Sequence, residues 1–400
     1  MSRLARRVGK MAGLLGWVAM VAGSITGRAA SQPGQAPVTD HARLWQAYAN
    51  RFISGDGRVI DPYGNDRTTS EGQSYAMFFA LVNNDRGRFD TLLRWTESNL
   101  GQGDLSVHLP AWSWGQGKDG KWGLLDPNSA SDSDLWIAYD LIEAGRLWND
   151  QRYATMGRRM AANIARHEVA NLPGFGPALL PGPVGLFKFP HSYVLNPSYM
   201  PIFILDRMAE LEPAGPWADI AAMYPKMIER SQRGGFAMDW VCYDPGSGFS
   251  PCQKDGKKTP SPVGSYDAIR VYLWTGMLPE TSSARARILH ALPGMDSYLQ
   301  HYGAPPEKIN SDGSAQSQAG PVGFSAALLP YLKSNSNDTL VAQQMVRLKS
   351  QLDEKSNLYG TGYGSGPTYY DQNLALFGSG WMEHKFQFGS SGELLVRWSR

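Results

Sequence analysis

The sequence predicts an all-α protein in which about twelve helices pair into six hairpins that close into a ring. Stretches with helical apolar spacing alternate with Gly-, Pro- and Ser-rich loops from residue 41 onward. The first helix of several pairs is apolar on nearly every side, which is typical of a helix covered all round. Helix starts that carry polar motifs recur roughly every 47 to 69 residues, which indicates a structural repeat. The predicted helices span 41–54, 70–84, 86–101, 131–148, 151–169, 197–211, 216–231, 264–276, 282–299, 320–333, 337–352 and 367–379.

The N-terminus has the features of a secretory signal. Basic residues lie between positions 3 and 10, an apolar run follows over 11–23, and small residues continue to Ala30. We therefore expect a signal peptide over 1–30, a linker over 31–38, and a secreted or periplasmic protein. An uncleaved membrane anchor is the alternative, although an apolar run of about 13 residues is short for a bilayer span.

The composition describes a globular protein without a nucleic-acid partner. The 400 residues are 42% hydrophobic and 18% charged, with a formal net charge of +2. Because no extended Lys/Arg run occurs outside the N-terminus, a neutral polymer fits better than a phosphate backbone. Nothing within the mature chain looks like an interdomain linker, so we expect one domain over 39–400. Its C-terminal segment, 389–400, is ambiguous.

The cysteines and histidines indicate a disulfide and no metal. The chain has two cysteines, Cys242 and Cys252, in a polar Gly- and Pro-rich segment. Export would place them in an oxidising compartment, so we expect a disulfide; two unrelated thiols are the alternative. The seven His residues show no paired-ligand spacing. We therefore expect no metal and no organic cofactor.

Three acidic residues precede predicted helices at matching points of the repeat. They are Glu71, Asp132 and Asp267. In a ring of hairpins the starts of the inner helices line one pit, so these carboxylates would meet there. Glycoside hydrolysis needs one carboxyl group to protonate the leaving oxygen and another to activate water. The structural alternatives are a capping box between Thr68 and Glu71, an Asp/Ser cap at Asp132, and a local ion pair between Asp267 and Arg270.

Aromatic residues in loops supply the second part of the predicted site. The apolar faces of glucose stack on Trp or Tyr, and three Trp residues lie in the Gly-rich segment 111–123, where core burial is less expected than in a helix. Core packing is the competing explanation for the Tyr residues at later helix starts. The predicted substrate-binding residues are Arg270, Trp112, Trp114, Trp122, Tyr199, Tyr369, Tyr370 and Gln73. Long loops at 102–130, 171–196, 232–263 and 301–320 would form the walls of a groove.

One segment resembles a known family signature. Residues 130–134 read Ala-Ser-Asp-Ser-Asp and are followed by Ile137-Ala138 and Trp148. This resembles the signature of glycoside hydrolase family 8, and within it the secreted endoglucanases that accompany bacterial cellulose synthesis. Ser133 departs from the pattern, which has Ala or Gly at that place.

The resemblance implies an (α/α)6 barrel and an inverting endo-β-1,4-glucanase. Glu71 then matches the general acid, Asp267 the general base of the cellulase-type subgroup, and Asp132 the residue that holds the sugar at the cleavage point, with Arg270 beside the base. The implied partner is a β-1,4-glucan chain, and a functional association with the cellulose synthase machinery follows from the subgroup.

Three alternatives remain from the sequence. The family also contains chitosanases, lichenases and xylan-acting enzymes. A non-catalytic glucan-binding protein could keep the same barrel. A polysaccharide lyase is a third possibility, but a lyase acting on uronic acids should have a more basic groove.

Overall fold

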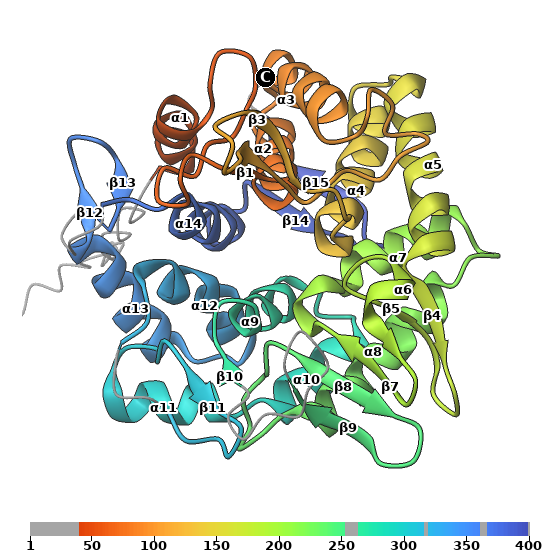
Figure 1. The fold of residues 1–400 in the computed structure, drawn as a ribbon. Coiled ribbons are helices and arrows are strands. Elements are labelled where there is room, and N and C mark those ends of the chain that lie inside the picture. The colour runs from red at the N-terminus through yellow and green to blue at the C-terminus, as the bar shows by residue number, and fades with distance from the viewer. Residues whose placement is uncertain (1–39, 253–262, 316–318, 361–365, 399–400) are drawn as a thin grey trace, which may run out of the picture. The chain divides into compact units, whose positions relative to one another are not determined.

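Helices dominate the part of the chain that the computed structural model describes, residues 40–252, 263–315, 319–360 and 366–398. Contacts group Pro37–Arg400 into one compact unit. The predicted signal over 1–30 and linker over 31–38 lie outside the described residues. Six helices lie toward the centre of the ring in Figure 1: α2 (Ser70–Val82), α4 (Ser131–Leu147), α7 (Ile202–Leu211), α9 (Ala268–Met277), α12 (Val322–Ser334) and α14 (Tyr369–Met382).

The remaining helices surround this inner set. They are α1 (His41–Phe52), α3 (Arg86–Asn99), α5 (Gln151–His167), α8 (Trp217–Ser231), α10 (Ser283–Ala291), α11 (Gly294–Tyr302) and α13 (Asp338–Ser350). A single turn, α6 (Val184–Phe187), and the 3-10 helix η1 (Pro197–Tyr199) lie in long connections. The predicted all-α (α/α)6 barrel is confirmed.

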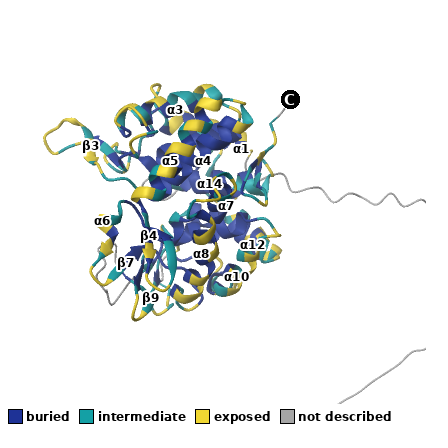
Figure 2. Cartoon of the chain, turned by 90° about the vertical axis from the view of Figure 1, so that its right-hand side faces the viewer, coloured by how far each residue is buried: buried dark blue, intermediate teal, exposed yellow. Residues whose placement is uncertain are grey.

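Burial separates the two layers as the sequence pattern predicts. In α2 every residue except Glu71 is buried, whereas α5 buries only one stripe centred on Met160 and Ile164. Figure 2 shows this contrast, with buried residues concentrated on the inner helices. A helix buried on all sides has no solvated face, so a partly exposed carboxylate at its first turn requires a separate explanation.

Aromatic side chains fill the centre of the barrel, and the C-terminal hairpin adds to them. Phe377 of α14 packs against Phe78, Trp136 and Trp274 from three other inner helices. The hairpin β14 (Phe386–Phe388) and β15 (Leu394–Val396) contributes Phe388, whose ring stacks 3.7 Å from that of Phe203. The barrel is therefore a packed core rather than a channel.

Short strands occur in the connections, where the sequence predicts only loops. A three-stranded sheet orders β1 (Thr68–Thr69), β2 (Ser113–Gln116) and β3 (Trp122–Asp126); a four-stranded sheet orders β6 (Lys188–Phe189), β7 (Ser192–Leu195), β8 (Val241–Asp244) and β9 (Gly248–Pro251). Two-residue or four-residue pairs complete the set: β4 (Val169–Leu172) with β5 (Gly176–Leu179), β10 (Val263–Gly264) with β11 (Ile309–Asn310), and β12 (Leu352–Asp353) with β13 (Leu358–Tyr359).

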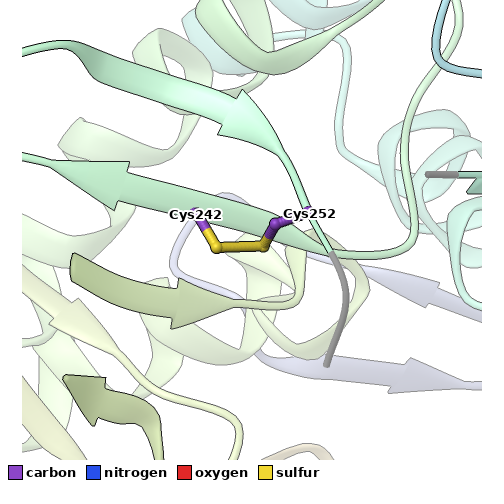
Figure 3. Close-up of a disulfide and its surroundings, with 2 residues drawn as sticks. All are labelled: Cys242 and Cys252. Atoms are coloured by element: carbon purple, nitrogen blue, oxygen red, sulfur yellow. A yellow bond between two sulfur atoms is a disulfide. The ribbon is translucent and has the colours of Figure 1, made fainter. Parts of the chain in front are cut away.

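The predicted disulfide is confirmed. Cys242 of β8 is joined to Cys252, which directly follows β9, with 5.6 Å between the Cα atoms (Figure 3). It closes the β8–β9 hairpin. Among the described residues, no helix has the length and apolar character needed to cross a bilayer.

Three predicted helices differ from the structure, and in two of them a proline lies at the break. The predicted helix 282–299 is two helices, α10 and α11, separated at Leu292 and Pro293. The predicted helix 197–211 begins as η1 and restarts after Pro201. The predicted helix 264–276 begins only at Ala268.

Candidate active site

The three predicted acids meet on one buried guanidinium. Arg270, on the first turn of α9, has a side chain that is 2% exposed and contacts Glu71, Asp132 and Asp267. Nη1 contacts Glu71 Oε2 and lies 3.3 Å from Asp132 Oδ2, while Nη2 lies 2.6 Å from Asp267 Oδ1. Residues separated by almost two hundred positions thus share one charge, as the ring of hairpins predicts.

Two hydroxyl groups also bind this arginine. Tyr75 OH lies 3.0 Å from Nη1, and Ser198 Oγ lies 3.1 Å from Nη2. Tyr75 is on α2, one turn after Glu71, and Ser198 belongs to η1. Because the guanidinium is planar and forked, these partners fix its orientation as well as its position. Neither residue is predictable from the sequence, since a buried Tyr and a Ser in a long connection carry no distinguishing pattern.

Glu71 lies in the first turn of α2, and the strand directly before this helix fixes its position by pairing in a short sheet. Thr68 and Thr69 form β1 and pair with Trp114 and Ser113 of β2. The N-cap of α2 is Thr69, whose hydroxyl accepts from Gly72 N at 3.1 Å. The predicted capping box with Thr68 as N-cap is therefore wrong, because the Thr68 hydroxyl donates to Val59 O in the loop before β1.

The Glu71 carboxylate is free of the helix cap and faces the cleft. Its side chain is 20% exposed, and Oε1 accepts from Tyr369 OH at 3.2 Å. Burial raises the pKa of Tyr369 well above its usual value, so this hydroxyl keeps its proton and acts as a donor. Tyr369 and Arg270 therefore bind different oxygens of the same carboxylate.

Asp132 is the most deeply buried of the three acids. Its Oδ1 accepts from Ser133 N at 2.8 Å, and its side chain is 6% exposed. Burial raises the pKa of Asp132 to about 6, with the charge of Glu71 adding to the effect and Arg270 opposing it. Asp132 therefore changes charge in a pH range in which ordinary aspartates are fully ionised.

A second aspartate, Asp239, fixes the backbone around Asp267. Asp239 Oδ1 accepts from Ser265 N and from Ala268 N, both at 2.7 Å, so one carboxylate binds the backbone on either side of Asp267. Burial, followed by the charge of Asp267, raises the pKa of Asp239 to about 7. The Asp267 side chain itself remains 25% exposed. Asp239 is not predictable from the sequence, because its role depends on two backbone amides some thirty residues away.

A cleft of about 720 Å³ opens beside Glu71 and Asp267. Tyr369 and Tyr370 line it, and Tyr370 OH donates to Tyr266 O across the cleft wall. Tyr199 lies on the other side of the arginine, with the Arg270 Cζ 5.6 Å from its ring centre. The structure therefore brings all three predicted Tyr residues to the acids.

The three predicted Trp residues lie on one segment but in different places. Trp112 is anchored next to the acid, because its carbonyl accepts from Ser70 N at 3.0 Å. Trp114 and Trp122 lie on the β2–β3 hairpin, where their rings stack on each other 5.3 Å apart. Neither borders the cleft beside Glu71.

Gln73 does not fit its predicted role in substrate binding. Its side chain is fully buried; Oε1 accepts from Val59 N at 2.6 Å, and Nε2 donates to Gly57 O and to Thr96 Oγ1. These bonds tie the loop before β1 to α2 and α3 and leave no amide atom for a sugar hydroxyl. We correct the prediction to a structural role.

The arrangement supports acid–base chemistry with side chains alone. Glu71 and Asp267 line the cleft and contact different terminal nitrogens of Arg270. Asp132 also contacts this arginine and is more deeply buried. Aromatic residues flank the acids on both sides. Among the described residues, no group of three or more His, Cys, Asp or Glu side chains has the arrangement of a metal site.

The chain is similar to known proteins over most of its length. The sequence profile of "Glycosyl hydrolases family 8" matches residues 17–384. The chain is 45% identical over 388 residues to an endoglucanase of Xanthomonas axonopodis pv. citri, covering 97% of this chain and 96% of that one, and 42% identical over 358 residues to an endoglucanase of Escherichia coli K12, covering 89% and 91%. A crystal structure of an endo-1,4-D-glucanase from Vibrio fischeri superposes with a TM-score of 0.81 at 39% identity, covering 89% of this chain and 99% of that chain.

Proposed function

The chain belongs to glycosyl hydrolase family 8, and from this premise we propose that it is an exported, inverting endo-β-1,4-glucanase that acts on cellulose-type chains. The observation that carries the proposal is the grouping of Glu71, Asp132 and Asp267 on Arg270 at the wall of an aromatic cleft. The endoglucanases of Xanthomonas and E. coli, each more than 40% identical, support the substrate class.

In the proposed reaction Glu71 is the general acid and Asp267 the general base. Asp267 removes a proton from a water molecule, the water oxygen attacks the anomeric carbon, and the bond to the glycosidic oxygen breaks as Glu71 gives that oxygen its proton. One water molecule is consumed and the configuration inverts. Asp132 and Arg270 hold the sugar ring and the two acids in place. The two carboxyl groups should stand about 6.5 to 9.5 Å apart with glucan bound.

Export and a role beside cellulose synthesis complete the proposal. The basic and apolar pattern of residues 3–30 supports a signal peptide, and the confirmed disulfide suits an oxidising compartment. A glucanase exported next to a cellulose synthase would act on nascent chains. The alternatives in the family, a chitosanase, a lichenase or a xylanase, are separated by a reducing-sugar assay on carboxymethylcellulose, chitosan, mixed-linkage glucan and xylan.

The decisive test compares Glu71→Gln and Asp267→Asn with the unaltered protein in a proton-NMR time course on cellopentaose. We expect internal cleavage, the α-anomer as first product, and a loss of turnover of about 10²- to 10⁴-fold or more in each variant. Circular dichroism and the unfolding temperature serve as the folding control. Near-normal turnover by a folded Glu71→Gln variant would overturn the assignment of the acid, and a β-anomeric first product would overturn inversion.

A further inference from the structure

The β2–β3 hairpin carries an aromatic stack that the catalytic proposal does not use. Trp122 is 48% exposed and Leu124, two residues further along the same strand, is 43% exposed. Trp114 pairs with Leu124 in the strand register, so these three side chains share one face of the hairpin. Figure 2 shows the hairpin standing out from the body of the protein, with exposed residues toward its outer end.

This stack is anchored in the core. Trp95 of α3 is 5% exposed and packs edge-on against Trp114 at 5.4 Å, and Trp114 stacks on Trp122 at 5.3 Å with 27° between the ring planes. Arg58 lies 4.7 Å from the centre of each of the two outer rings. A large apolar ring whose position is already fixed by packing loses little conformational entropy when a ligand packs on its exposed side.

Hydrogen bonding and strand pairing connect the stack to the segment that carries Glu71. Arg58 Nε lies 2.9 Å from Thr68 Oγ1 while its guanidinium covers both Trp rings, and Thr68 is three residues before Glu71. Thr68 also pairs directly with Trp114 across β1 and β2. On the opposite face of the hairpin, Leu125 lies next to Gly115 and the backbone of Arg67, and Arg67 lines the cleft.

The chemistry of the exposed face favours a sugar chain over a protein. A stable protein partner typically needs about 20 to 30 residues on each side, whereas this face offers two indole rings and one or two leucines. A Trp ring presents a flat apolar surface of the size of a pyranose ring, and a glucan passing out of the cleft needs only one or two such contacts.

From this juxtaposition we propose that the exposed face of Trp122, with Leu124 beside it, is an accessory binding surface for polymeric β-glucan outside the catalytic cleft. It contacts sugar units remote from the bond that is cut. Short oligosaccharides held in the cleft do not reach it, so it raises affinity for long chains selectively. This inference rests on the proposed glucanase function and names the part of the polymer that the hairpin recognises.

The test uses Trp122→Ala in the otherwise unaltered protein, with Tyr302→Ala as matched control. Tyr302 is an aromatic residue on α11 that is 63% exposed and has no part in the hairpin. The measurement is kcat/KM on carboxymethylcellulose divided by kcat/KM on cellotetraose. We expect this ratio to fall about 3- to 10-fold in Trp122→Ala through a higher KM for the polymer, and to stay unchanged in the control.

A binding assay gives a second, independent measurement. In a Glu71→Gln background, Trp122→Ala should lower the fraction of protein retained on amorphous cellulose by a similar factor. An unchanged ratio together with unchanged retention would overturn the proposal, as would an equal loss on both substrates, which would place Trp122 in the cleft or in folding. A loss of association with other proteins at unchanged polymer kinetics would also overturn it. Failure of the unaltered protein to cut any β-1,4-glucan would instead refute the proposed function.

Discussion

Arg270 is the residue on which the catalytic geometry depends. A buried arginine is tolerable here because its positive charge is paired with neighbouring carboxylates, and removing that charge leaves the three acids without compensation. The sequence placed Arg270 beside Asp267 as an i, i+3 neighbour. Its contacts with Glu71 and Asp132 depend on ring closure, which local spacing does not encode.

Replacing Arg270 with Lys should therefore remove activity and lower stability together. Lysine keeps the charge but has a single nitrogen, so it cannot hold Glu71 and Asp267 at once. We expect kcat on carboxymethylcellulose to fall at least about 100-fold and the free energy of unfolding to drop by about 3–5 kcal/mol. Arg287→Lys is the control, because the Arg287–Glu229 ion pair is 42% and 39% exposed and should contribute almost nothing. Equal effects in both variants would contradict the central role of Arg270.

A second buried carboxyl pair lies next to the signature segment. Asp134, two residues after Asp132, is fully buried and lies close enough to Glu168 for the charge of each carboxyl group to act on the other, and Ser129 Oγ donates to Glu168 Oε1. Burial raises the pKa of both groups, that of Glu168 to about 8. Two carboxylates cannot bond each other unless a proton lies between them. The sequence predicted Asp134 only as one of two cap residues.

This pair should make stability fall as pH rises. Both groups hold protons in the folded state at pH values where the unfolded chain has released them, so their stabilising effect is complete below about pH 4 and is lost as pH approaches 8. In Asp134→Asn an amide N–H replaces the shared proton. We expect the variant to lose less stability than the unaltered protein between pH 6 and 9 in urea unfolding, with the exposed Asp119→Asn as control. Parallel pH curves for all three proteins would show that no proton is shared.

At the scale of elements, apolar spacing predicts the helices well and their breaks poorly. The inner helices α2, α4 and α12 begin within two residues of the predicted starts. The helix predicted over 282–299 divides at Pro293, which has no backbone N–H to continue the hydrogen bonding of α10. The hairpin β2–β3 was also missed, because its short strands are stabilised by pairing with β1 and by the Trp stack rather than by alternation along the sequence.

Glycines in inner helices follow from the same close packing. A Cβ atom added to Gly378 of α14 would lie 2.1 Å from Ala326 O of α12, well inside contact distance. The two inner helices can approach this closely only without a side chain at that point. The sequence shows a glycine inside a helical pattern but not the helix that it faces.

Gly378→Ala should therefore destabilise the barrel by about 1–3 kcal/mol or more, since either α14 or α12 must move. Gly87→Ala in α3 is the matched control, because a Cβ there would meet nothing within 4 Å and alanine favours the helix. Chemical denaturation should show a lower midpoint for Gly378→Ala and an equal or higher one for Gly87→Ala. A midpoint for Gly378→Ala as high as that of the control would mean that the α12–α14 contact is looser than described.

At the scale of the whole molecule, the repeat predicts a ring of helices but not the C-terminal hairpin β14–β15 that packs against the inner helices. The family profile ends at residue 384, and the segment after it is ambiguous from sequence. In the structure Phe386 and Leu394 are fully buried, and Leu394 N donates to Glu143 of α4 at 2.9 Å. Glu143 is fully buried and also pairs with Arg207 of α7 and Arg146. The hairpin thus joins two inner helices through one carboxylate.

Removal of residues 386–400 should destabilise the entire barrel rather than the active site alone. Each lost aromatic or leucine side chain contributes about 1.5–3 kcal/mol of burial, and Phe78, Phe203 and Phe377 would face water. We expect a lower unfolding temperature, binding of a hydrophobic dye, and activity lost in proportion to the folded fraction. Removal of Ser399 and Arg400 alone is the control. If the shortened protein unfolded at the same temperature as this control, the hairpin would be a surface appendage, and closure of the barrel would rest on the inner helices alone.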